Sequence, residues 1–211
     1  MAIAFVRSTS GSAGATPWSF NLAALPIAGN LLVVAISSNS GATNAITSVT
    51  DNMSNTYSRA ISSIWSSGHA TTEMWFTPNT VPAASTHTLT ITSSLGGATI
   101  VPVVQEFSGI TTTSPLDQTN WTDTDASTTI NAGPTGTTTQ AAELVVMSGT
   151  QNANETHTVG SGFSNLAQTT GISAISMQSK VESSTGAKSG TITSNNNGDK
   201  SGLIATFKGV S

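Results

Sequence analysis

The chain has 211 residues, a net charge of −4 and no cysteine, and 8% of its residues are charged, against about 25% in an average globular domain. Its six Lys and Arg residues are too few for the basic surface that nucleic-acid binding needs. The absence of cysteine excludes disulfide frameworks, thiolate metal sites and thiol nucleophiles. Ser and Thr make up about a third of the chain, and the low charge with many β-branched residues argues against disorder.

The N-terminal segment Met1–Arg7 predicts a first β-strand rather than a secretory signal, because no basic residue precedes its apolar part. The longest strongly apolar run, Leu31–Ile36, is far shorter than the roughly 20 residues that a spanning helix needs. We therefore expect a soluble protein with no membrane partner and no export signal. The Ser/Thr-rich composition favours a virion surface, in a particle built in the host cytoplasm. The alternative is an extracellular fragment that has lost its signal.

Strand patterns follow one another along the chain, and helical periodicity is nearly absent. Leu31–Ile36 and Ile100–Val104 are continuous apolar runs, typical of strands buried on both faces. Pro102 is expected at a bulge or a sheet edge, because proline cannot donate to a ladder. Thr88–Thr92 alternates as a half-buried strand does, and Ile175–Val181 is a further strand. Short strands between frequent turn signals predict an all-β, antiparallel β-sandwich of the jelly-roll or Ig-like kind.

An internal duplication is the most informative feature of the sequence. Three segments recur in the same order: Asn30–Ala35 as Ala142–Met147, Thr90–Ser93 as Thr191–Ser194, and Val103–Ile110 as Leu203–Val210. Their offset falls from about 112 residues to about 100, which predicts shorter loops in the second copy. Tyr57 is matched with Phe163. The alternative is chance recurrence of strand and turn patterns, but agreement in order favours a duplication.

The duplication predicts one β-sandwich domain over residues 1–211, built from two pseudo-repeated halves, about 1–110 and 127–211. The polar connection between them, residues 111–126, contains the apolar anchors Leu116 and Trp121, which a free linker would not carry. Small weakly charged halves with open sheet edges would aggregate. A core shared by both halves is therefore favoured over two separate sandwiches.

The common catalytic motifs are missing from the sequence, and we predict that the protein is not an enzyme. His87 and His157 are expected to be exposed surface histidines, as is His69. Glu73 and Glu106 are the one carboxylate pair that could face each other across a glycosidase cleft. This pair is kept as a minor alternative.

The segment Asp123–Asp125 has the spacing of a calcium loop but lacks the glycine and the distal glutamate, so it is interpreted as a solvated turn. No metal site and no cofactor is predicted. Trp65 and Trp121 stand in polar surroundings, and an exposed Trp beside Asp is how many β-sandwiches stack a sugar ring. Trp65, Trp121, Asp123 and Asp125 are therefore the candidate glycan contacts. The alternative is that each Trp covers a loop or a subunit contact.

Several segments together resemble a known module, and they cover most of the chain: Met1–Val6, Gly29–Val34, Val49–Asp51 with Asn55–Tyr57, and Glu106–Gly109 with Pro115–Asp117. They look like an uncharacterised β-sandwich module of tailed-phage particles and of large secreted bacterial proteins. The motifs consist of residues that are typical of strands and turns. The resemblance implies a structural or adhesive role, such as a capsid cement (decoration) protein, a tail-fibre domain or a filament subunit. It supplies no catalytic residues.

The sequence thus predicts a structural protein of a viral particle, a capsid cement or decoration protein. Its expected partners are the major capsid protein or another virion protein, and further copies of itself. A weakly charged surface has little charge to desolvate at an interface, and closed symmetric oligomers such as a trimer then follow. The alternatives are a carbohydrate-binding or adhesive module, or a subunit of an extracellular filament.

Overall fold

The computed structural model describes residues 1–39, 44–64, 70–151, 154–170 and 173–210. Every regular element within these ranges is a β-strand, and the strands pair antiparallel. The predicted all-β, antiparallel fold class is therefore confirmed. This result follows from a chain that is rich in β-branched residues and that has turn residues between its short apolar runs.

The first half forms two sheets. The central sheet has the order β1-β9-β4-β7-β6, with β2 also paired to β9, and an outer sheet has the order β3-β8-β5. The strands are β1 (Ala4–Ser10), β2 (Gly14–Ala15), β3 (Trp18–Asn21), β4 (Leu31–Ser38), β5 (Ile46–Asp51), β6 (Ser58–Ile64), β7 (Thr71–Thr77), β8 (Thr88–Ser93) and β9 (Thr99–Ser108).

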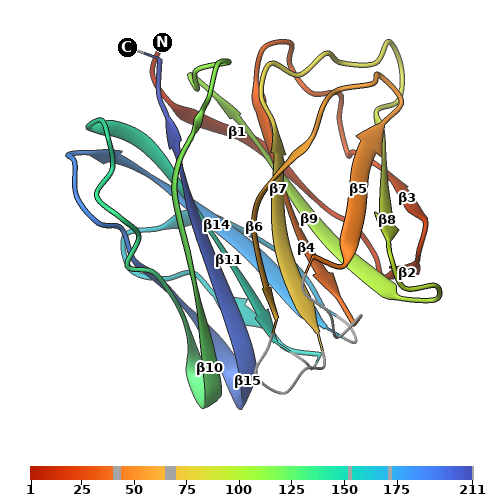
Figure 1. Ribbon diagram of the computed structural model, residues 1–211, viewed down its shortest axis with the longest axis vertical. Coiled ribbons are helices and arrows are strands. Elements are labelled where there is room, and N and C mark those ends of the chain that lie inside the picture. Colours follow the sequence, from red (N-terminus) through yellow and green to blue (C-terminus); the bar gives the residue numbers. More distant parts are fainter. Residues whose placement is uncertain (40–43, 65–69, 152–153, 171–172, 211) are drawn as a thin grey trace.

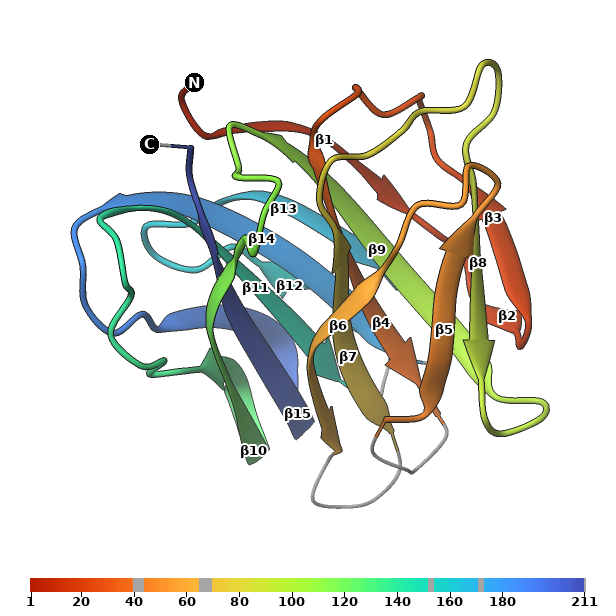
Figure 2. The same cartoon turned by 45° about the horizontal axis from the view of Figure 1, so that its top comes forward.

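The second half forms one sheet with the order β10-β15-β11-β14-β13, and β12 also pairs with β15. Its strands are β10 (Leu116–Ala132), β11 (Ala142–Gln151), β12 (His157–Thr158), β13 (Ser164–Thr169), β14 (Ala174–Ser183) and β15 (Gly190–Lys208). Figure 1 shows this sheet on the left, the central sheet of the first half in the middle and the outer sheet on the right. Figure 2 shows the same layers turned by 45°.

The two halves repeat one topology. The order β10-β15-β11-β14-β13 follows β1-β9-β4-β7-β6 strand for strand, and β12 takes the place of β5. The long strand β10 corresponds to β1 and β3 of the first half, and β15 corresponds to β8 and β9. The register of β10 and β15 shifts in the middle of the pair, and beyond that point the two strands fold over as an outer layer. Gly202 permits this close approach, because a Cβ atom there would lie 2.0 Å from the carbonyl oxygen of Asn131.

Matching the halves by register corrects the sequence alignment by one residue. The cross-strand pair Leu32↔Glu106 of the first half is equivalent to the pair Val145↔Thr206 of the second. The residue equivalent to Leu144 is therefore Leu31, not Leu32. Leu31 and Leu144 both point into the core between the two halves. A slip of one residue would turn every side chain of the strand to the other face, and a run of apolar residues on both faces hides that slip in the sequence.

Three clusters of buried apolar side chains hold the layers together. One lies between the outer and central sheets of the first half, a second lies under the folded-over ends of β10 and β15, and the third is shared by both halves. The shared core contains Leu31, Val33, Ala35, Met74, Phe76, Val101, Val103, Phe107 and Ile110 from the first half, with Leu144, Val146, Ala167, Ile175, Met177, Leu203, Ala205 and Phe207 from the second. Tyr57 and Phe163 occupy equivalent places in the other two clusters.

The predicted polar connection over residues 111–126 is wrong for most of its length. Strand β10 begins at Leu116, and it pairs with β15 as β1 pairs with β9. Leu116 packs on the shared core in the place that Phe5 takes in the first half. An edge strand that is half exposed along its length reads as a loop in the sequence, because few of its positions need to be apolar.

The expectation for Pro102 is also wrong, since β9 is a central strand and pairs with β4 without a bulge at this residue. On its other side, the proline lies opposite the gap between β1 and β2. Its carbonyl oxygen accepts a hydrogen bond from the backbone N–H of Gly11. The missing N–H group therefore falls where the neighbouring strand is interrupted.

Candidate functional site

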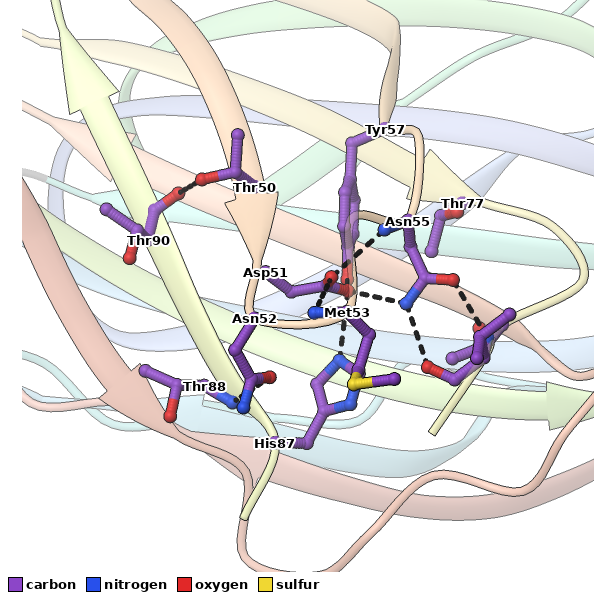
Figure 3. A network of polar contacts seen from close by, with 12 residues as sticks. Thr50, Asp51, Asn52, Met53, Asn55, Tyr57, Thr77, His87, Thr88 and Thr90 are labelled. Atoms are coloured by element: carbon purple, nitrogen blue, oxygen red, sulfur yellow. Dashed lines mark hydrogen bonds and ion pairs between the residues drawn. The ribbon is translucent and has the colours of Figure 1, made fainter. Parts of the chain in front are cut away.

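A buried carboxylate organises the turn that follows β5. Oδ1 of Asp51 accepts hydrogen bonds from the backbone N–H groups of Met53 (2.9 Å) and Asn55 (3.0 Å). Oδ2 accepts from Nδ2 of Asn55 (2.8 Å) and from the hydroxyl of Tyr57 (3.0 Å). Figure 3 shows these side chains meeting below the ring of Tyr57. Burial raises the pKa of Asp51, but these hydrogen bonds more than offset it and hold the pKa below its usual value.

His87 is the fourth residue that contacts this carboxylate, and it makes the fifth polar contact. Its Nε2 atom lies 3.0 Å from Oδ2 of Asp51, and neither side chain is exposed to solvent. The expectation of an exposed surface histidine is therefore wrong. His87 has the same parity as Leu89 and Ile91, which face the core, whereas Thr88 and Thr90 face outward. The alternation in the sequence carried this information, because residues two apart share a face.

The turn is tied to a second loop, which follows β7. Asn55 donates from Nδ2 to the carbonyl oxygen of Val81 (3.0 Å) and accepts from the backbone N–H of Val81 (2.8 Å). The same amide also bonds to Asp51. Both hydrogens of the Asn55 side-chain amide and its oxygen are thus used to fix two loops against each other. Two loops that are fixed to each other in this way can form a rigid binding surface.

These two loops and the chain before β10 enclose a surface cleft of about 480 Å³, within the range typical of ligand sites. We call it the Phe76 cleft. It is lined by one aromatic ring, two prolines and a set of hydroxyl and amide side chains: Ser54, Asn55, Thr56, Ser58, Phe76, Thr77, Pro78, Asn79, Ser114 and Pro115. No charged residue lines it. The sequence analysis missed this site, because its three walls are far apart along the chain.

The cleft also gathers unusual backbone conformations. Six non-glycine residues of the described ranges have a positive φ, and Ser54 (58°), Asn79 (55°) and Ser114 (46°) line the Phe76 cleft. A left-handed conformation costs a serine about 1 kcal/mol or more. Backbone strain of this kind is concentrated at functional sites in proteins. The cleft is therefore the strongest candidate for a binding site in the described part of the chain.

The predicted carboxylate pair does not form a catalytic site. Glu73 accepts from the backbone N–H of Ile46 (2.8 Å) and from Nε of Arg59 (2.6 Å). Glu106 accepts from Nδ2 of Asn30 (2.6 Å) and forms an ion pair with Arg7 (2.9 Å). Both carboxylates are buried, and each has its own arginine. The minor alternative of a glycosidase pair is therefore wrong, and both residues hold the fold.

Another pair of carboxyl groups does meet in the second half. Glu143, on β11, is buried against Asp117 and Thr206. Burial is the main cause that raises the pKa of Glu143 to about 7, and Asp117 adds to it. Burial also opposes ionisation of Asp117, but hydrogen bonds from the backbone N–H (2.6 Å) and hydroxyl (2.7 Å) of Thr139 outweigh this effect and lower its pKa. At mildly acidic pH, below about 7, Glu143 therefore holds a proton that Asp117 lacks.

This arrangement predicts a pH-dependent effect of Glu143→Gln. Below about pH 4.5 the carboxyl is protonated in both the folded and the unfolded chain, and glutamine should change stability little. As the pH rises from 4.5 to 7, only the unfolded chain loses its proton freely, so native stability falls. We expect the variant to be more stable than the parent by about 2 kcal/mol at pH 8. Urea unfolding at pH 4.5 and pH 8 measures both differences. A variant advantage that is equal at both pH values would contradict this assignment.

His157 is likewise buried, contrary to the expectation of an exposed histidine. Its Nδ1 atom lies 2.8 Å from the hydroxyl of Ser176. Burial, with a contribution from the charge of Lys200, lowers the pKa of His157 to about 4. His69 lies outside the described residues.

Three of the four candidate glycan contacts, Trp121, Asp123 and Asp125, lie on β10. Trp121 is 43% exposed and lies in β10 with Asp123 two residues further on, and the interval from Asp123 to Asp125 is strand rather than the expected solvated turn. In the register of β10 and β15, Trp121 lies opposite Leu203, a residue of the shared core. Trp65 lies outside the described residues. A glycan contact at Trp121, Asp123 and Asp125 stays a prediction.

Comparison with known proteins gave no relatives: no protein-family model, no curated protein and no solved structure matches the chain. In the described ranges no helix is long and apolar enough to span a membrane. Among the same residues no three His, Cys, Asp or Glu side chains are grouped as they would be around a metal ion.

Proposed function

We propose that this chain is a non-enzymatic structural protein of a viral particle, a capsid cement or decoration protein that self-associates and binds the shell surface. The placement of charge supports the proposal. Of the ten acidic and six basic residues, six are buried, namely Glu73, Glu106, Glu143, Glu155, Lys188 and Lys200. Asp125 alone among the charged residues is exposed, and the others are half-buried as whole residues, although the side chain of Asp51 is not exposed.

Contacts inside the protein hold several of the charged side chains in place. Both arginines are engaged with buried carboxylates, at Glu73 and Glu106. The amine of Lys200 donates to the carbonyl oxygens of Asn196 (3.0 Å) and Gly198 (3.1 Å). The outer surface is thus rich in hydroxyl and amide side chains, which lose less solvation free energy than charged groups do when a partner covers them. Such a surface suits a protein that is covered by neighbours.

This proposal predicts capsid binding that depends weakly on salt. The purified protein is expected to form a closed oligomer, with a trimer as the form that suits a capsid site, and to bind matching capsids that lack it. Because few charges face outward, its affinity should change less than about threefold between 0.05 and 0.5 M salt. Sedimentation of protein with depleted capsids at both concentrations gives the result. A monomer that leaves the capsids unbound would refute the role, and a steep salt dependence would refute the charge argument.

A further inference from the structure

The Phe76 cleft has the chemistry of a carbohydrate site, and we propose that it binds a neutral oligosaccharide. A sugar ring presents an apolar C–H face and an edge of hydroxyl groups. The cleft offers matching surfaces, with the half-buried Pro78 and the largely buried Phe76 (7% exposed) and Pro115 as apolar contacts and hydroxyl and amide groups around them. Without a charged residue in the lining, it holds no counterion for a phosphate, a carboxylate or an ammonium group. This proposal is independent of the role in a capsid.

The polar groups around the cleft are available to a ligand. Ser54, Thr56, Ser58, Asn79 and Ser114 are exposed, and none of these side chains is a partner in the hydrogen bonds of the described residues. Asn55 and Tyr57 behave differently, because their polar atoms are used within the scaffold around Asp51. Asn55 and Tyr57 thus fix the loops, whereas the exposed side chains face the solvent. A pre-formed cleft binds without the cost of ordering its loops.

The left-handed residues of the cleft allow a clean test. Glycine adopts a positive φ readily, so Ser54→Gly, Asn79→Gly and Ser114→Gly remove the polar side chains without disturbing the backbone. Ala126→Gly is the matched control, because Ala126 also has a positive φ (46°) but does not line the cleft. Trp121→Ala tests the rival site on β10.

The probes are an array of immobilised neutral and anionic glycans, followed by calorimetric titration with the neutral oligosaccharide that is retained best. The parent protein is expected to retain at least one neutral glycan. Asn79→Gly should weaken binding about tenfold, the loss expected for one or two hydrogen bonds, and the triple glycine variant should abolish it. Ala126→Gly and Trp121→Ala should bind as the parent does.

Three results would overturn the proposal. The first is an array on which the parent retains no neutral glycan. The second is unchanged binding by the triple glycine variant, provided that its thermal unfolding shows a folded protein. The third is binding that Trp121→Ala abolishes, which would move the site to β10. Capsid binding is measured separately, so failure at the cleft leaves that role to be judged on its own result.

Discussion

Phe207→Ala is expected to lower the free energy of unfolding by about 3–5 kcal/mol, the usual cost of deleting a buried phenyl ring. Phe207 is fully buried in the core shared by the two halves. Its ring meets the ring of Phe76 edge to face, with 5.4 Å between their centroids. This contact joins β15 of the second half to β7 of the first. Removal of the Phe207 ring should therefore destabilise both halves.

Because the core is shared, the two halves should unfold together in the parent and in the variant. Urea unfolding followed by tryptophan fluorescence and by far-ultraviolet circular dichroism should give coincident transitions with a lower midpoint. Val181→Ala is the control, since Val181 is 54% exposed and its truncation should cost less than about 0.5 kcal/mol. Two separate transitions, with only one of them shifted by Phe207→Ala, would show that the halves are independent.

Arg59→Met is expected to cost about 3–5 kcal/mol, because it leaves a buried carboxylate without its cation. Nε of Arg59 lies 2.6 Å from Oε2 of Glu73, and the guanidinium stands 4.8 Å from the ring centre of Trp75. The same guanidinium donates to the carbonyl oxygen of Ile46, and Glu73 accepts from the N–H of Ile46. Methionine keeps most of the apolar stem and removes the charge, so the loss reports on the ion pair and its hydrogen bonds.

The matched control is Lys180→Met. Lys180 also pairs with a carboxylate, Glu182, at 2.7 Å, but both side chains are partly exposed, and such pairs are worth about 0–1 kcal/mol. Urea unfolding of the two variants should therefore differ by at least about 2 kcal/mol. The double variant Arg59→Met/Glu73→Gln should recover part of the loss, because it removes the unpaired charge. Equal, small losses for Arg59→Met and Lys180→Met would contradict the burial argument.

Much of the fold could be predicted from the sequence, because strand patterning depends on local alternation. The apolar runs at β4 and β9, the alternation at β8 and the strand predicted at β14 correspond to strands of the structure, and the duplicated segments occupy equivalent strands. The errors have physical causes. The sequence alignment matches Leu32 with Leu144. In a strand that is buried on both faces, the apolar pattern does not show which face a residue occupies, so a shift of one residue goes unnoticed. The first part of β10 was interpreted as a connection because an edge strand needs few apolar positions.

The candidate site was less accessible to sequence reasoning. Its walls come from the turn after β5, the loop after β7 and the chain before β10, and nothing local in the sequence places these segments together. Asp51 meets Tyr57 across the turn between β5 and β6, and it meets His87 because β5 pairs with β8. Glu143 and Asp117 also meet only in the complete sheet, because they lie on β11 and β10, the two neighbours of β15.

The two shifted groups of the second half have a combined consequence for the proton balance of folding. Near about pH 5.5 the unfolded chain carries a proton on most His157 side chains and on few Glu143 side chains, whereas the folded chain carries it on Glu143 and not on His157. Folding therefore transfers one proton, in effect, from the imidazole to the carboxyl. Net uptake from the solvent is close to zero at these two groups, although each taken alone makes folding depend on pH.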